Sequence, residues 1–233
     1  MSGAPLIALA AGGTGGHMFP AESLAGELMR RGLRVALVTD RRGQAFGGRL
    51  PDVALHRVRA GRFGAGIVSK FVGIAELALG TLEARRLLRA LAPRVAVGFG
   101  GYPSVPTMLA AVQLKIPTLI HEQNAILGRA NRLLAPRVKR VATSFPEVGG
   151  MRATDLARTV ETGNPVRQEF VALRDKPYPV PGDDGPVHVL VLGGSQGARV
   201  LSEVIPAAIA MLADSVRRRL RLAQQARAED IEA

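Results

Sequence analysis

The sequence predicts an α/β protein built on parallel sheets of the doubly wound type. Short apolar segments alternate with amphipathic helical segments along most of the chain, and a glycine-rich turn directly follows the first apolar segment. This alternation is typical of βαβ units, in which helices join successive parallel strands. A second strand and glycine turn after residue 186 predict that two such domains are present.

The first βαβ unit is expected in residues 5–40. The continuous apolar run at residues 5–11 predicts a buried parallel strand, and the turn GGTGGH follows it. We expect Pro20 to open the next helix, because proline is tolerated in a first helical turn. Gly32 is well placed to end that helix, and residues 34–40 are the next strand.

The alternation continues to residue 143. Further strands are expected at residues 53–58, 94–99, 116–120 and 138–143, and helices at residues 66–91, in the segment ending at Lys115, and through Leu133 and Leu134. The polar sequence HEQN is expected just beyond the carboxyl end of the strand at residues 116–120. Ligands of open parallel sheets gather at that edge.

The domain boundary is expected at residues 174–186, a segment rich in proline, glycine and charge that reads as a linker. After it the opening pattern recurs as VHVLVLGGSQGAR. The predicted organisation is therefore a Rossmann-like domain at residues 1–173, the linker, and the start of a second Rossmann-like domain at residues 187–233.

Composition limits the possible functions. The chain of 233 residues has no cysteine, which excludes disulfides, thiolate nucleophiles and cysteine-ligated zinc. A formal net charge of +12 favours phosphate-rich partners. Aromatic residues make up only 4% and tryptophan is missing, so stacking platforms are few and no nucleic-acid partner is expected. The sequence suggests neither a secretory signal nor a membrane span.

The turn GGTGGH predicts a phosphate site. Glycines after a strand let backbone amides approach a ligand, and the N-terminus of the following helix favours a diphosphate. The dinucleotide fingerprint is not met, because Met18 takes the place of its third glycine. Two interpretations of His17 stay open: a general base kept neutral by the helix N-terminus, or a capping and phosphate-contacting residue.

Other motifs have a structural alternative beside the functional one. HEQNA is not a zinc motif, because Ala125 takes the place of its second histidine, and the adjacent His121 and Glu122 should point opposite ways on an extended segment. We favour Asn124 for hydrogen bonds to sugar or diphosphate, the alternative being a helix cap. Arg167, which ends TGNPVR, suits phosphate, the alternative being a solvated arginine.

Residues 62–88 mix apolar and basic side chains. They fit either an amphipathic helix lying on an anionic membrane or an ordinary helix with one buried face.

Five motifs, taken together and in order, resemble the MurG family of N-acetylglucosaminyltransferases. They are AGGTGGH (11–17), GFGGYPSVP (98–106), HEQNAILGRANR (121–132), TGNPVR (162–167) and VLGGSQGAR (191–199). The resemblance runs from about residue 5 to residue 213. It implies the GT-B architecture, in which two Rossmann-like domains enclose the active site. Residues 1–173 would bind the acceptor and residues 187–233 would begin the UDP-sugar domain.

The resemblance also implies a reaction. N-acetylglucosamine passes from UDP-N-acetylglucosamine to undecaprenyl-diphospho-muramoylpentapeptide (lipid I), with inversion, to give lipid II for peptidoglycan synthesis. No cofactor and no metal are implied. The location implied is peripheral, at the cytoplasmic face of the inner membrane, beside anionic lipid headgroups. Matching positions make His17 the candidate base. The candidate substrate and nucleotide contacts are Thr14, Gly15, Gly16, Asn124, Arg167 and Ser195.

The chain departs from the family at its end, because the family's uracil, ribose and sugar contacts would lie beyond Ala233. We therefore expect a C-terminally truncated member that binds the donor poorly and is inactive as written. One alternative is an inactive remnant that keeps acceptor binding. A second is a nicotinamide-dependent oxidoreductase with Asp40 on the ribose. A third is a basic protein that binds nucleic acid through charge alone.

Overall fold

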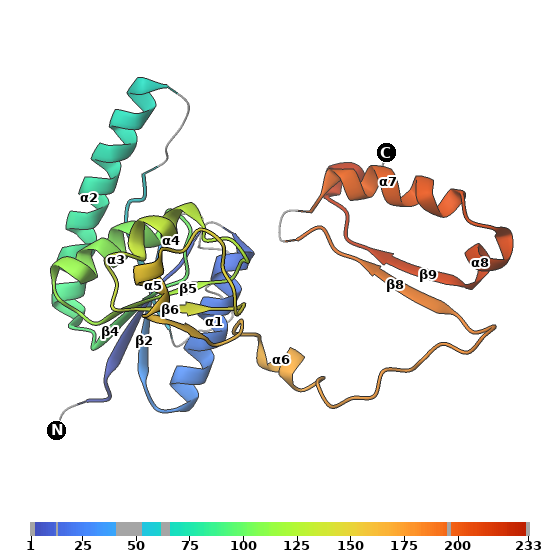
Figure 1. Cartoon of the computed structure of the whole chain (residues 1–233), viewed down its shortest axis with the longest axis horizontal. Helices are drawn as coiled ribbons and strands as arrows, with labels where there is room; N and C mark the ends of the chain where they lie inside the picture. The colour runs from blue at the N-terminus through green and yellow to red at the C-terminus, as the bar shows by residue number, and fades with distance from the viewer. Residues whose placement is uncertain (1–2, 13, 41–52, 62–65, 195–196, 232–233) are drawn as a thin grey trace. The chain divides into compact units, whose positions relative to one another are not determined.

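The computed structural model describes residues 3–12, 14–40, 53–61, 66–194 and 197–231; within these, the side chains of residues 67, 68 and 70 are not described. The chain divides into two compact units, residues 1–172 and residues 173–233, and each is described by itself (Figure 1). Among the described residues, no helix combines the length and the apolar character needed to cross a membrane.

The first unit is built on a seven-stranded sheet in the order β3-β2-β1-β4-β5-β6-β7, with every neighbouring pair parallel. Its strands are β1 (Leu6–Ala10), β2 (Arg34–Thr39), β3 (Ala54–Arg57), β4 (Val95–Gly98), β5 (Thr118–Glu122), β6 (Arg140–Thr143) and β7 (Thr159–Glu161). This order, in which the chain starts in the middle and reverses direction, is the doubly wound arrangement that the sequence predicts.

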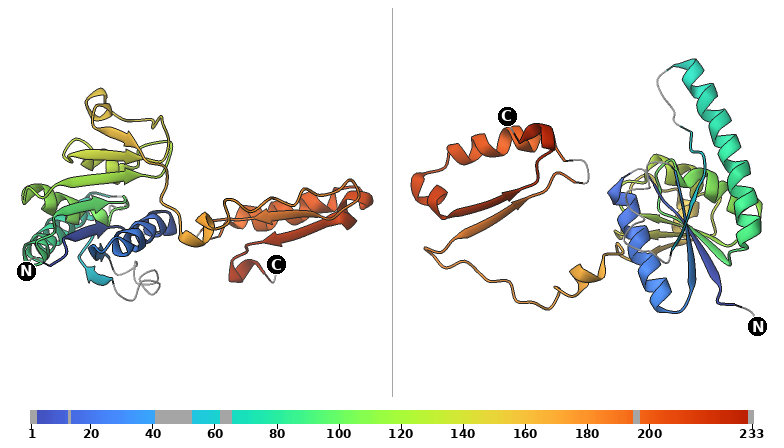
Figure 2. Two further views of the ribbon diagram at one scale, coloured as in Figure 1. Left: turned by 90° about the horizontal axis from the view of Figure 1, so that it is seen from below. Right: turned by 180° about the vertical axis from the view of Figure 1, so that it is seen from behind.

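Helices cover both faces of this sheet (Figure 2). They are α1 (Gly15–Arg30), α2 (Ile67–Leu91), α3 (Ser104–Gln113), α4 (Arg129–Leu134) and α5 (Ala153–Leu156). The short helix α6 (Gln168–Val171) follows β7 and has no buried residue. The alternation along β1 shows which helix lies on which face. Leu9 packs in one core cluster with Met18 of α1, whereas Ala8 packs in the other with Leu88 of α2 and Met108 of α3.

Helix α1 begins earlier than expected. It starts at Gly15 with Thr14 as N-cap, so Pro20 lies inside the helix and does not open it. Proline at this position gives up only the backbone bond to the carbonyl of Gly16, close to the helix start. The earlier start brings the glycines and His17 into the first turn. The predicted end is confirmed, because Gly32 has φ +77° and its amide donates to the carbonyl of Met29.

Strand β5 runs further than expected. The sequence prediction ends the strand at Ile120, but His121 and Glu122 still pair with Ala142 and Thr143 of β6. Parallel pairing with β6 therefore extends the strand through two polar residues. The side chains of His121 and Glu122 are thus fixed by the ladder and point to opposite sides of the sheet.

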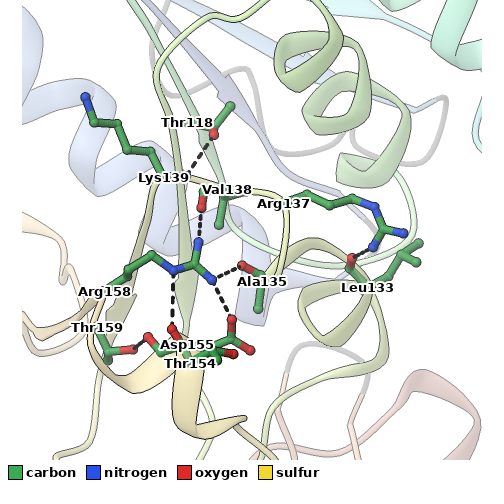
Figure 3. Close-up of polar contacts among 10 residues, drawn as sticks. All are labelled: Thr118, Leu133, Ala135, Arg137, Val138, Lys139, Thr154, Asp155, Arg158 and Thr159. Atoms are coloured by element: carbon green, nitrogen blue, oxygen red, sulfur yellow. Dashed lines mark hydrogen bonds and ion pairs between the residues drawn. The ribbon is translucent and has the colours of Figure 1, made fainter.

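One arginine ties the edge of the sheet together (Figure 3). The guanidinium of Arg158 donates to the carbonyls of Ala135, 3.1 Å away, and Val138, and forms an ion pair with Asp155. Asp155 is buried, so this pair joins the ends of α4 and α5 to β7. Arg158 is therefore a structural residue of the fold.

The second unit contains one strand–helix–strand repeat, as predicted. Strand β8 (Val187–Val191) pairs in parallel with β9 (Leu220–Gln224), and α7 (Arg199–Ala210) and α8 (Asp214–Arg219) lie between them in sequence. A short 3-10 helix, Ala228–Asp230, follows. Both strands are largely exposed, including Leu190 and Leu222. This unit therefore has a thin core.

Candidate active site

The site is built where the sheet reverses direction, between β1 and β4. The two strands are neighbours, and α1 and α3 leave their carboxyl ends toward opposite faces. In open α/β sheets a crevice forms at such a point. The two turns touch there, because a Cβ placed on Gly12 would be 2.6 Å from Cβ of Pro103. Only glycine allows the two turns to approach so closely.

His17 lies in the first turn of α1, with its ring against the second glycine turn. A Cβ on Gly101 would stand 3.1 Å from Cδ2 of His17 and 2.5 Å from the carbonyl oxygen of Gly12. A Cβ on Gly100 would be 3.4 Å from Nδ1 and Cε1 of the same ring. Gly100 and Gly101 also have φ of +82° and +73°. The GFGGYPSVP motif thus forms the surface against which the ring of His17 packs.

A chain of hydrogen bonds leads from His17 into the sheet. Nδ1 of His17 lies 3.2 Å from Oε1 of Gln123, and Nε2 of Gln123 lies 3.0 Å from Nδ1 of His121. Nε2 of His121 lies 3.0 Å from the carbonyl oxygen of Gly163. His121 is buried beside the ring of Phe99, at 5.7 Å between centroids. Burial lowers the pKa of His121, while the Gly163 bond and the charge of Glu122 partly oppose this.

Glu122 supports the structure of the neighbouring loop. Its Oε1 accepts from the backbone and side-chain nitrogens of Asn124, at 3.0 and 2.8 Å. Its Oε2 accepts from the amide of Gly128, the N-cap of α4, and from Nδ2 of Asn131, both at 2.9 Å. The residue as a whole is 1% exposed. Four donors therefore use both carboxylate oxygens, and no chemistry is assigned to this residue.

Arg167 lies beside the start of α1. Its guanidinium carbon stands 4.8 Å from the ring centre of Phe19 and 5.0 Å from that of Phe170, in cation–π geometry. Arg167 and the two rings line a cavity of about 180 Å³ together with Gly15 and Gly16. The structure thus brings a held cation next to the N-terminal turn of a helix, which is an arrangement suited to a phosphate group.

The predicted site residues separate into three places. Thr14, Gly15, Gly16 and His17 form the start of α1, and Arg167 joins them through the cavity. Thr14 is exposed, and its hydroxyl does not cap the helix. Asn124 is exposed at the end of β5, held by Glu122. Ser195 lies outside the described residues.

The sequence interpretation overlooked Gln123, which connects His17 to His121. Alternation along the extended segment was the available signal, since His121 and Gln123 are two residues apart and therefore share a side. The same alternation places Glu122 with Asn124. Within the part of the chain that the structure describes, no three His, Asp or Glu side chains gather as a metal site would require.

Residues 7–143 match the model of the glycosyltransferase family 28 N-terminal domain. The chain belongs to this family. A relative from Rhodospirillum centenum, the UDP-N-acetylglucosamine–N-acetylmuramyl-(pentapeptide) pyrophosphoryl-undecaprenol N-acetylglucosamine transferase, is 57% identical over 233 residues, all of this chain and 61% of that protein. A relative of the same name from Rhodospirillum rubrum is 55% identical over 232 residues, 99% of this chain and 59% of that protein.

Solved structures agree with the predicted fold class. The Acinetobacter baumannii MurG structure superposes with a TM-score of 0.68 at 25% identity, covering 98% of this chain and 68% of that one. A glycotransferase of kitacinnamycin gives 0.64 at 15% identity, covering 97% and 66%, which shows the fold alone. The α/β GT-B class and the resemblance to the MurG family are thereby confirmed. The present chain spans about three fifths of the length of the curated relatives that it matches.

Proposed function

We propose that this family 28 chain forms the acceptor-binding part, and the start of the donor-binding part, of an inverting N-acetylglucosaminyltransferase. The donor is UDP-N-acetylglucosamine, the acceptor is lipid I, and the products are lipid II and UDP. The observation that carries the proposal is His17, seated in the first turn of α1 against Gly100 and Gly101 at the reversal of the sheet. The names of the relatives that align over the whole chain supply the substrates.

The chemistry follows from this placement. His17 takes the proton of the acceptor hydroxyl, whose oxygen forms a bond to the anomeric carbon of the donor sugar. The bond from that carbon to the diphosphate breaks on the opposite face, and its electron pair leaves with UDP, so the configuration inverts. Both substrates carry a diphosphate. The N-terminal turn of α1 at Gly15 and Gly16 and the guanidinium of Arg167 line one cavity, which is suited to hold one of them.

Helix α2 supports a peripheral position on the membrane. Its first half extends away from the sheet in Figure 1 and in the right-hand view of Figure 2. Its exposed large apolar residues are Phe71, Val72, Ile74, Leu79 and Leu82. The helical period places them along one broad side, and the exposed Arg86 and Arg89 continue that side toward the C-terminus. We infer that α2 lies on anionic headgroups at the cytoplasmic face of the inner membrane, where a lipid-linked acceptor is found.

The test is transfer of labelled N-acetylglucosamine from its UDP donor to a lipid I analogue. The chain is assayed as it stands and also joined to the part of the Rhodospirillum centenum relative that follows the matched region. We expect transfer by the chimera, and a loss of about 10²- to 10⁴-fold in the His17→Ala chimera. The exposed His188 on β8 supplies the control, His188→Ala, which should keep its activity.

A folded chimera without transfer would overturn the proposed function. Acceptor binding by such an inactive protein would favour the alternative of a remnant that only binds lipid I. Family 28 membership already favours sugar transfer over the nicotinamide alternative.

A further inference from the structure

We propose that Gln123 and His121 are positioning residues that fix the single ring proton of neutral His17 on Nδ1 and so keep Nε2 available as the base. The proposal rests on the proposed role of His17 in transfer. Its physical content, the tautomer of one imidazole, is independent of activity. Three hydrogen bonds set the proton positions one after another, starting from a backbone carbonyl.

The first bond fixes His121. A carbonyl oxygen only accepts, so Nε2 of His121 carries the hydrogen that is donated to Gly163, at 3.0 Å. Burial lowers the pKa of this imidazole, which favours the neutral form. In the neutral form Nδ1 carries no proton and must accept.

The second bond fixes the amide of Gln123. Its nitrogen lies 3.0 Å from Nδ1 of His121 and 3.1 Å from the backbone carbonyl oxygen of His121. Both atoms are acceptors, so the amide cannot be reversed without placing its oxygen against them. Two independent partners therefore hold the NH2 group on the His121 side. The amide oxygen is directed at the start of α1.

The third bond fixes His17. Oε1 of Gln123 can only accept, and it lies 3.2 Å from Nδ1 of His17, so that nitrogen carries the hydrogen. Nε2 is then the basic atom of the neutral ring. The aspartate of a Ser-His-Asp triad orients its histidine in a similar way but also offers a negative charge. A neutral glutamine supplies orientation alone, so removing it should change which nitrogen is basic and leave substrate binding largely intact.

The direct test is NMR of the chain with ¹⁵N-labelled histidine. The chain has four histidines, so long-range proton–nitrogen correlations can be assigned by replacing each one in turn. We expect neutral His17 to show a protonated Nδ1 and an unprotonated Nε2. In Gln123→Met, which keeps the side-chain length, we expect the Nε2–H form to appear. Gln113→Met, at an exposed glutamine of α3, is the control and should leave the spectrum of His17 unchanged.

Transfer by the chimera supplies the second measurement. We expect Gln123→Met to lower kcat by about 10- to 100-fold, part of what a general base contributes, with little change in KM. A urea midpoint close to that of the unaltered chain would show that the variant is folded. A protonated Nε2 on His17 in the unaltered chain would overturn the proposal whatever the activity. The predicted tautomer in a folded but inactive chimera would leave it standing and overturn the proposed function.

Discussion

At the scale of single residues, burial on β5 has opposite consequences for two neighbouring side chains. Glu122 is surrounded by four donors and supports the loop that leads to α4. His121 meets one carbonyl and one amide and is favoured in its neutral form. Buried polar groups with complete hydrogen bonding stabilise a fold, and each loses that benefit when one partner is changed.

Glu122→Gln should lower the free energy of unfolding by about 2–4 kcal/mol. Glutamine replaces one carboxylate oxygen with an NH2 group, which cannot accept from the nitrogen donors that face that position. Hydrogen bonds to a charged group are therefore lost, and those donors are left without an acceptor. Urea unfolding measures the change. Glu83→Gln is the control, since the Glu83–Arg59 pair has side chains 39% and 55% exposed and should contribute less than about 1 kcal/mol. Equal effects of the two substitutions would contradict the assignment.

His121 should make stability depend on pH. Its pKa is lowered on folding from an ordinary 6.5, so the unfolded chain binds more protons just below that pH. Stability from this residue is present above about pH 6.5 and is lost as the pH falls, by at most about 1.4 kcal/mol per pH unit. Urea midpoints from pH 8 to about 5 should therefore fall more steeply for the unaltered chain than for His121→Gln. A matching replacement of the exposed His188 should keep the steep dependence.

At the scale of elements, the two glycine turns and the start of α1 form one packed group. Gly12 and Gly101 touch each other's turns, and His17 lies against the second turn. The backbone of one turn therefore sets the position of a side chain from another element. A substitution in either turn should therefore change both the stability of the first unit and the position of the His17 ring.

Gly101→Ala should cost more than Gly32→Ala, although both positions have positive φ. Gly32 has open space around a Cβ, so alanine there costs only the left-handed backbone, about 1–2 kcal/mol. At Gly101 the Cβ would be 2.5 Å from the carbonyl oxygen of Gly12, which adds about 1–3 kcal/mol. Denaturant midpoints of the two variants give the difference, and equal losses would show that the turns yield without cost.

The exposed side of α2 should carry membrane binding. Changing Phe71 and Ile74 to serine should reduce co-sedimentation with vesicles that contain anionic lipid, because less apolar surface enters the headgroup region. Added salt should weaken the remaining binding, which depends on charge. Leu156 and Val160 are apolar residues of the same unit that are also more than half exposed, and serine there serves as the control. Parallel losses in both double variants would contradict a specific role of α2.

At the scale of the whole molecule, the two units differ in how much they can bury. The first encloses a seven-stranded sheet between helices. The second has two strands and keeps Leu190, Val200 and Val204 more than half exposed. Two-stranded sheets are marginal in water, and stability grows with the apolar area removed from it. The first unit should therefore supply the cooperative unfolding transition.

Cutting the chain between the units tests this. Unfolding in urea is followed by circular dichroism. Residues 1–172 should unfold with the same urea midpoint as the main transition of the whole chain. Residues 173–233 alone should show weak secondary structure and a broad, shallow transition, because their apolar side chains stay in contact with water. A sharp transition of the shorter piece would show that its strands and α7 form a core of their own.

Local patterns in the sequence were enough to predict the parallel sheet of the first unit and the strand–helix–strand repeat after residue 186. Apolar runs, glycine turns and Gly32 as a helix end are local signals, set by the period of side chains and by the φ that only glycine adopts readily. The five motifs and their order along the chain were also sufficient to identify the family. These features depend on residues that are close together in the chain, so they can be predicted from short stretches of sequence.

The hydrogen bonds and contacts that join the site residues could not be predicted from local patterns. The extension of β5 through His121 and Glu122 depends on its pairing with β6. The early start of α1 depends on how the first turn of that helix packs. The contact between His17 and Gln123 joins positions 106 residues apart. Hydrogen bonds of that kind are specified by the packing of separate strands and helices, which no local pattern encodes.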